Sequence, residues 1–159
     1  MASDIFAKIG DIKGESMDAK HTGEIDVLSF SWGVNNAGSS ASGGGAGVGI
    51  ASFHDLTFVH KLDKASPILM QACANGDHFK DATITHRKAG KGQQEYLIYK
   101  LDEVYITGVT HGGQPDGDHS ESVSLQFAKV SMEYHPQKGD GSLDAAVFFK
   151  HDIKGKKKL

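Results

Sequence analysis

The feature that most constrains this chain is an alternation of apolar and polar residues with a period of two, which recurs along most of its length. The large apolar residues that share one parity in VLSFSWGV (27–34) are Leu28, Phe30, Trp32 and Val34. Ser29 and Ser31 share the other parity. This spacing predicts strands with one buried face, because successive side chains of a strand point to opposite sides. Comparable candidates are residues 5–9, 52–61, 81–88, 95–109, 121–135 and 145–153.

The segment 121–135 changes phase part-way along. Val123, Leu125 and Phe127 share one parity, whereas Val130 and Met132 share the other. A strand that keeps one buried face can change parity where an extra residue is inserted. We therefore predict a bulge near Phe127 that bends this strand.

One segment, LDKASPILMQACANGD (62–77), breaks the alternation and predicts a short helix. Asp63 or Ser66 is placed to cap it, Pro67 suits its first turn, and Gly76 suits its end. Leu69, Ala72 and Cys73 have the spacing of one apolar helix face.

Many strands beside one short helix predict a mainly β fold. We expect a barrel-like β-sandwich of antiparallel strands with one short flanking α-helix. A chain of 159 residues is the length of a single domain, here taken as residues 1–159. The aromatic residues Trp32, Phe148 and Phe149, together with Leu69 and Met70 of the helix, are interpreted as core residues.

The charge balance limits the partners. Seventeen basic residues against twenty acidic ones give a net charge of −3, which argues against nucleic acid. The single cysteine, Cys73, cannot form an internal disulfide. The N-terminal MASDIFAKIG is not a secretory signal, and no apolar run is long enough for membrane insertion. We expect a cytoplasmic, soluble chain that leaves the cell only by a route without a cleavable signal.

Two segments lack strand or helix patterning. The stretch NNAGSSASGGGAGVGIAS (35–52) contains neither a Walker loop nor a dinucleotide-binding fingerprint, so residues 36–50 are predicted to form a flexible Gly/Ser-rich loop. The tail KGKKKL (154–159) is predicted to be a solvated, frayed basic terminus.

Residues with catalytic or metal-binding potential do not form a recognisable pattern. Nine histidines lack zinc-site spacing, and we interpret them as surface residues. The segment HGGQPDGDHSE (111–121) is a turn that lacks the order of a calcium-binding loop. No serine lies in a G-x-S-x-G motif. We therefore expect no catalytic residues, no metal, no cofactor and no enzyme activity.

Five stretches of the chain then indicate a family. They are KIGDIKGES (8–16), GEIDVLSFSWGV (23–34), FHDLTFVHKLDKASPILMQACANGDHF (53–79), ITHRKAGKGQQEYLIYKLDEVYITGV (84–109) and ESVSLQFAKVSMEYHPQKGDGS (121–142). In this order they resemble the haemolysin-coregulated protein (Hcp) family of the bacterial type VI secretion system. The most specific parts are EIDVLSFSWG, DKASPILMQAC and the RKAG…EYLI pairing.

The resemblance implies a function in assembly. It implies a small barrel-like β-sandwich with one helix, hexameric rings with a wide channel, and stacking of these rings into the inner tube of a contractile apparatus. The implied partners are further copies of the chain, a contractile sheath, a valine–glycine-repeat spike protein and small effector proteins held in the lumen. It also implies assembly in the cytoplasm followed by secretion without a signal peptide.

Two groups of residues become site candidates in this interpretation. Ser29 and Ser31 are candidates for the lumen lining, although alternation alone fits outer solvent equally well. The loop 36–50 is a candidate for ring stacking, and its small residues would let neighbouring backbones approach closely. The stacking candidates are Ser42, Gly43, Gly44, Gly45, Gly47 and Gly49.

Two other classes of protein remain as alternatives. A secreted β-sandwich carbohydrate-binding module fits the fold class, although such sites usually expose aromatic side chains in loops. A secreted hydrolase fits less well, because a catalytic constellation is missing. An idle surface insertion is the alternative for the loop 36–50, since surface loops tolerate changes in length.

Overall fold

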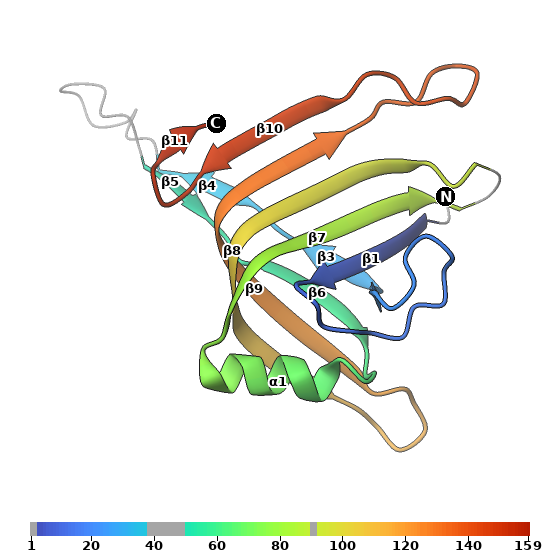
Figure 1. The fold of residues 1–159 in the computed structure, drawn as a ribbon, viewed down its shortest axis with the longest axis vertical. Coiled ribbons are helices and arrows are strands. Elements are labelled where there is room, and N and C mark those ends of the chain that lie inside the picture. The colour runs from blue at the N-terminus through green and yellow to red at the C-terminus, as the bar shows by residue number, and fades with distance from the viewer. Residues whose placement is uncertain (1–2, 38–49, 90–91) are drawn as a thin grey trace.

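The computed structural model describes residues 3–37, 50–89 and 92–159, which form antiparallel strands and one helix (Figure 1). The elements in chain order are β1 (Ser3–Ile9), β2 (Ile25–Asp26), β3 (Ser29–Ser31), β4 (Val34–Asn36), β5 (Ala51–Phe53), β6 (Leu56–Lys61), α1 (Ser66–Asn75), β7 (His78–Lys88), β8 (Glu95–Gly112), β9 (Ser120–Tyr134), β10 (Val147–Asp152) and β11 (Lys157–Lys158). The predicted mainly β class with one short helix is confirmed over these residues. No described helix has the length and apolar character needed to span a membrane.

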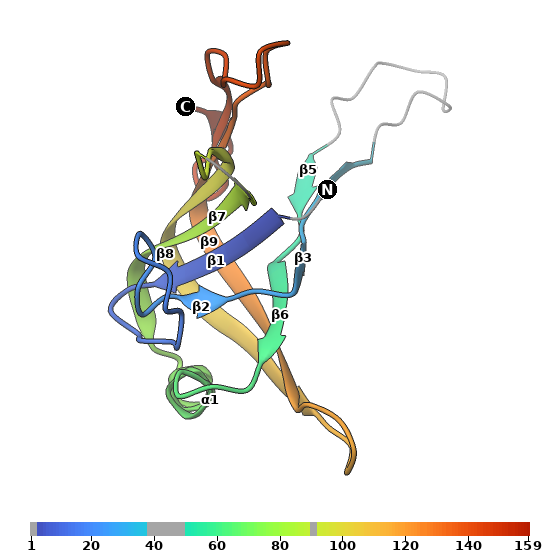
Figure 2. The same cartoon turned by 90° about the vertical axis from the view of Figure 1, so that its right-hand side faces the viewer.

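Strand β9 belongs to both layers of the fold. It pairs with β8 from Ser120 to Tyr134. On its other side, β10 pairs with residues 129–134 and β6 pairs with residues 120–125. The sheet therefore forks, with one branch running through β10 to β11 and the other through β6 to β3. Figure 2 shows β3 and β6 across from β1, β7 and β8.

The segment that joins β2 to β3 connects the two layers along one side. β2 pairs with β1, and β3 pairs with β6. Between them, the Val27 N–H donates to the Ile5 carbonyl at 2.9 Å, and the Leu28 N–H donates to the Val59 carbonyl at 2.8 Å. The sheet is not closed into a barrel, and the fold is an antiparallel β-sandwich.

The phase change in β9 coincides with a bend in both long strands. Burial along β9 changes parity between Phe127 and Val130, as predicted. The inserted residue, however, lies in β8, because Ile106 faces Leu125 and Gly108 faces Ser124, with Thr107 between them. The prediction of a bulge in β9 itself is therefore wrong, while the bend is confirmed (Figure 1).

The core lies between the two branches of the sheet. Its largest fully buried hydrophobic side chains come from β1, β2, β6, β7, β8, β9 and the helix. They are Ile9, Ile25, Leu56, Phe58, Leu69, Ile84, Leu101, Val104, Val123 and Leu125. Alternation had indicated the parity of Leu56 and Phe58 in one strand and of Val123 and Leu125 in another, because an inward parity is preserved wherever a strand is buried on one face.

Helix α1 covers one end of the sandwich (Figure 1). Leu69 and Ala72 are buried, and the partly buried Cys73 packs against the core, which confirms the predicted apolar face. The chain leaves the helix at Gly76 with φ of 69°, a left-handed conformation that glycine adopts without strain from a Cβ. Ala65, which directly precedes the helix, makes no side-chain cap bond. Both predicted capping residues nevertheless act in the first turn, because Asp63 Oδ1 accepts from the Ala65 N–H at 2.8 Å and Ser66 Oγ accepts from the Asp63 N–H at 3.1 Å.

Several apolar residues predicted to be buried are exposed. Leu28 is 58% exposed because its backbone bonds to β6 while Val27 takes the buried position. Val34 lies in the β4–β5 hairpin, outside the main sheet. Met70 points away from the core, and Phe148 is 52% exposed on β10. These four are corrections to the predicted core.

Two further aromatic predictions have mixed outcomes. Trp32 is half-buried against the core and stacks on Phe53, with ring centroids 6.0 Å apart. Phe149 is 38% exposed, and its ring centroid lies 6.3 Å from the ring centroid of Trp32. The basic tail is exposed as predicted, but it forms β11 on β10, so the prediction of a frayed end is wrong.

A buried histidine gives the fold a pH dependence. His86 of β7 is surrounded by aromatic rings, with the Phe30 centroid 4.5 Å and the Tyr99 centroid 6.1 Å away. Among the residues that the structure describes, its Nε2 finds no hydrogen-bond partner. Burial lowers the pKa of His86 to about 4, because the charged imidazolium would lose its hydration.

We expect the free energy of unfolding to fall as the pH drops from 6.5 toward 4. In that window the unfolded chain binds a proton at His86 that the folded chain does not bind, and the loss reaches about 3 kcal/mol. The His86→Leu variant should lose this part of the slope in urea titrations at several pH values. The His119→Leu variant, at an exposed position, should keep it. An unchanged slope in His86→Leu would contradict this assignment.

Candidate functional site

The serines of β3 point away from the core. Ser29 and Ser31 are exposed, and Phe30 between them packs against the core. Strand β3 pairs with β6, so that Ser29 lies opposite Val59 and Ser31 lies opposite Thr57. The predicted outward orientation of both serines follows from this register.

Hydroxyl side chains continue from β3 across the neighbouring strands. Thr57 of β6 lies opposite Ser124 of β9, and their hydroxyl oxygens are 3.0 Å apart. Ser122 of β9 lies opposite Thr110 of β8. Because directly opposed residues share a face, these side chains lie on the same side of the sheet as the two serines of β3. We call this set the hydroxyl face: Ser29, Ser31, Thr57, Thr110, Ser122 and Ser124.

The side chains that define the hydroxyl face are polar and uncharged, and the same side of β6 also carries Val59 and Lys61, the latter paired with Asp118 at 3.1 Å. The opposite side of this face carries Phe58, Val123 and Leu125 of the core, so this part of the sheet has one apolar and one hydroxyl-bearing surface. Thr57, Thr110, Ser122 and Ser124 were missed by the sequence analysis. Ser120, Ser122 and Ser124 share one parity, and this spacing could have indicated that Ser122 and Ser124 lie on one face.

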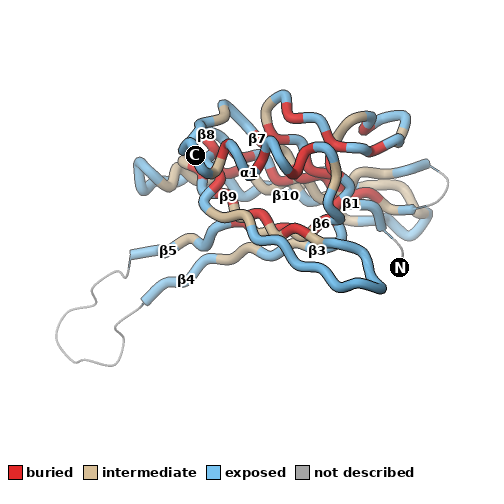
Figure 3. The backbone as a smooth tube through the Cα atoms, turned by 90° about the horizontal axis from the view of Figure 1, so that it is seen from below, coloured by how far each residue is buried: buried red, intermediate tan, exposed pale blue. Residues whose placement is uncertain are grey.

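The structure describes only the two ends of the candidate stacking loop. Strands β4 and β5 pair from Val34–Asn36 to Ala51–Phe53 and carry the two ends of the loop 36–50 away from the body (Figure 3). The candidates Ser42, Gly43, Gly44, Gly45, Gly47 and Gly49 lie outside the described residues. His54 holds the base of this hairpin, with Nε2 3.0 Å from the Asn35 amide nitrogen.

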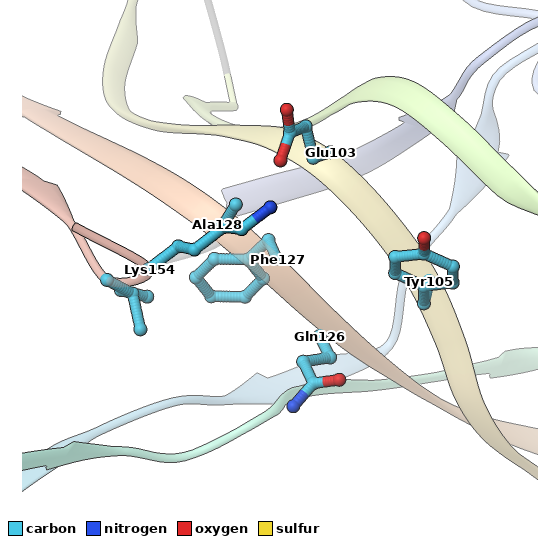
Figure 4. A pocket seen from close by; sticks show the side chains of 7 residues that line it. Glu103, Tyr105, Gln126, Phe127, Ala128 and Lys154 are labelled. Carbon is cyan, nitrogen blue, oxygen red and sulfur yellow. The ribbon is translucent and has the colours of Figure 1, made fainter.

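A surface hollow lies where β8 and β9 bend (Figure 4). Its floor is apolar, formed by Phe127, Ala128 and Ile153, and Glu103 and Lys154 stand at its rim. Glu103 has φ of 54°, a left-handed conformation that is strained for a residue with a side chain. Tyr105 and Gln126 complete its lining.

Two histidines share one buried carboxylate near the other end of the sandwich. Glu121 of β9 is buried, and its Oε1 lies 2.7 Å from Nε2 of the buried His60. Its Oε2 accepts from Nε2 of His111. Burial works to raise the pKa of Glu121, but the hydrogen bonds and charges of the two histidines outweigh it, so the pKa lies below its usual value.

A second ionic cluster fastens the segment between β1 and β2 to the sheet. The buried Arg87 guanidinium donates to Asp18 at 2.6 Å and to Asp4 at 3.1 Å, and it lies 5.0 Å from the Phe6 ring centroid. The hydrogen bond from Arg87 holds the pKa of Asp18 well below its usual range. His21 stacks on Phe6 at 4.4 Å between ring centroids.

These clusters correct the interpretation of the histidines as surface residues. His21, His60 and His86 are buried, two of them in carboxylate networks and one among aromatic rings. Isolated histidines in a strand pattern gave no sign of these distant partners. Over residues 3–37, 50–89 and 92–159, no group of three or more His, Cys, Asp or Glu side chains is arranged to hold a metal ion.

Comparison with known proteins gives consistent matches. The family model described as "Type VI secretion system effector, Hcp" matches residues 6–134. Protein hcp1 of Pseudomonas aeruginosa is 49% identical over 146 residues, which cover 91% of this chain and 90% of that protein. Hcp1 from Salmonella typhimurium has a TM-score of 0.79 at 37% identity and covers 100% of both chains. A solved type six secretion system protein has a TM-score of 0.93 at 27% identity, covering 99% of this chain and 100% of that one.

The fold and these matches define a β-sandwich protein of the type VI secretion system. Within that class, the chain belongs to the Hcp family of secreted effector and tube proteins. The resemblance seen in the sequence is thereby confirmed, and so is the fold that it implied.

We expect removal of the Glu121 charge to destabilise the fold. In the Glu121→Gln variant the amide oxygen can still accept from one histidine, but the amide NH2 group replaces the acceptor of the other, and the buried negative charge is lost. Breaking such a buried pair costs about 3 kcal/mol. Thermal and urea unfolding measure this loss. Glu133→Gln, which removes the charge of the partner of the partly exposed His135, is the matched control and should change stability much less, because solvent screens this pair. Equal effects of the two variants would contradict a special role of the buried carboxylate.

Proposed function

We propose that this chain is the structural subunit of the type VI secretion inner tube. Identical copies close into hexameric rings, and the rings stack into a tube inside a contractile sheath and beneath a valine–glycine-repeat spike protein. Contraction of the sheath expels the tube, so the protein assembles in the cytoplasm and reaches the medium without a signal peptide. The ring lumen carries small effector proteins.

The observation that carries this proposal is the match to Hcp proteins over nearly the whole chain, combined with the two-sided sheet. A channel that receives proteins needs a wall that water wets and that has no strong charge of either sign. The hydroxyl face meets this requirement, and its sheet is supported from behind by the core. We assign Ser29 and Ser31 to the lumen on this ground.

A structural role also fits the described side chains better than catalysis. Ionisable groups with large pKa shifts, such as Asp18 and His86, are held in ion pairs or among aromatic rings, away from the surface hollow. Perturbed groups of an active site are instead expected to face a shared cleft. We therefore infer no enzyme activity and no cofactor, and we disfavour the carbohydrate-binding and hydrolase alternatives.

Native mass spectrometry of the purified chain tests the assembly. We expect a closed hexamer as the main species, since a head-to-tail interface whose rotation closes gives a ring of fixed size. A monomer at all concentrations would overturn the proposed function. A monomer that binds glycan would favour the carbohydrate-binding alternative.

A second experiment tests the lumen assignment. The Ser31→Arg and Thr57→Arg variants place bulky charges on the hydroxyl face, whereas Ser3→Arg places one at the exposed start of β1. We expect all three to form rings and to be secreted, and the first two to lower effector secretion by about tenfold or more because the wall is narrowed and charged. Undiminished effector secretion by both variants would contradict the assignment.

The loop 36–50 is proposed to mediate contact between stacked rings. β4 and β5 hold its two ends outside the sandwich, where a neighbouring ring can be reached. We expect deletion of residues 40–48 to leave single rings intact and to abolish stacking and secretion, as seen by negative-stain microscopy and by analysis of the medium. Unchanged stacking and secretion would identify the segment as an idle insertion.

A further inference from the structure

The C-terminal edge of the sheet is strongly basic. Residues 147–159 contain five lysines and one carboxylate, and all five lysines are exposed. Because β11 is paired with β10 and the Leu159 N–H donates to the Lys150 carbonyl, these charges are held on an ordered surface. We call this surface the basic edge: Lys150, Lys154, Lys156, Lys157 and Lys158.

The basic edge also carries exposed apolar side chains. Val147 is 62% exposed, and Phe148 lies beside Lys150, whose Nζ is 4.7 Å from the Phe148 ring centroid. β11 pairs only with His151 and Asp152, so residues 147–149 have β9 as their one paired strand within the described part of the chain. An uncovered apolar edge strand favours pairing with another chain unless something covers it.

The opposite sign gathers around the segment between β1 and β2. Residues 4–26 contain six carboxylates against three lysines, and the buried Arg87 pairs with two of these carboxylates, so the flank keeps a net negative charge. We call this surface the acidic flank: Asp4, Asp11, Glu15, Asp18, Glu24 and Asp26. Burial raises the pKa of Asp26 against the opposing effect of a hydrogen bond from Ser16, and the charges of Asp4 and Asp18 raise it further. Met17 on this flank is 94% exposed.

The two surfaces lie on different sides of the subunit. β10 and β11 are at one end of the strand order, and β1 and β2 are at the other. Figure 1 shows β10 and β11 on the opposite side of the long strands from the loop that follows β1. The subunit thus has two distinct surfaces of opposite sign, each with exposed apolar side chains.

We propose that the basic edge of one copy docks on the acidic flank of the next copy. This contact rests on the proposed function and gives the ring interface a direction. A head-to-tail interface requires two different, complementary patches, whereas like surfaces facing each other would repel. The net charge of the whole chain is −3, so the attraction comes from the local separation of charge rather than from the total.

Charge reversal on each side tests the contact. One variant carries Lys154→Glu, Lys157→Glu and Lys158→Glu, which leaves two lysines against four carboxylates on the basic edge, and the other carries Asp11→Lys and Asp26→Lys. These residues are exposed, and they avoid Asp4, Asp18 and Glu24, which hold Arg87 and His21. In native mass spectrometry we expect each variant alone to form fewer rings than the unmodified chain, by a factor of about ten or more, because like charges then face each other.

Mixing the two variants provides the decisive readout. A subunit with two acidic surfaces can alternate with a subunit that has two basic surfaces, so the mixture should form rings with equal numbers of each. The chain that carries all five substitutions should again form rings by itself. Asp116→Lys, on the exposed β8–β9 loop, should leave ring formation unchanged, and circular dichroism confirms that each variant is folded.

Each other outcome overturns the docking assignment. If both single-side variants form rings, or if mixing the folded variants does not restore rings, the two surfaces do not meet. The proposed function would still stand in that case, provided that the unmodified chain forms rings. Absence of rings from the unmodified chain would overturn the proposed function and this contact together.

Discussion

The antiparallel ladder between β8 and β9 is the interaction on which the rest of the structure depends. It runs from Leu97 and Tyr134 to Gly112 and Ser120, and β9 passes from one branch of the sheet to the other within it. The extra residue at Thr107 and the left-handed Glu103 let both strands bend together. Without that shared bend, β6 and β10 could not pair with different parts of the same edge, and the hydroxyl face would lose its core support.

Burial that follows from a local alternation could be predicted from the sequence, whereas contacts between residues far apart in the chain could not. The alternation in residues 52–61 and 121–127 predicted the buried parity of Leu56, Phe58 and Leu125, because one-sided burial leaves a local pattern. The exposure of Leu28 and Phe148 could not be predicted, since it depends on which neighbouring strand bonds to the backbone. The His60–Glu121–His111 contact joins three strands, and nothing local in the sequence indicates it.

The candidate site shows the same division. Ser29 and Ser31 were identified from parity, but their continuation through Thr57, Ser124 and Ser122 appears only when the strand register is known. The frayed tail was a statistical expectation for a short run of lysines. In the structure that run is part of the sheet, so its charge becomes a surface property of a rigid subunit. The proposed function therefore depends on which faces and edges of the sheet are apolar, hydroxyl-bearing or charged.

The central claim is that identical copies surround a channel lined by hydroxyl side chains. A cryo-electron microscopy map of the assembled ring tests it most directly, because the side of the sheet that faces the axis is visible even at moderate detail. We expect β3, β6 and the adjoining halves of β8 and β9 on the inner wall, with Ser31 and Thr57 facing the channel. A ring in which these strands face the outside, or particles without a central opening, would contradict it.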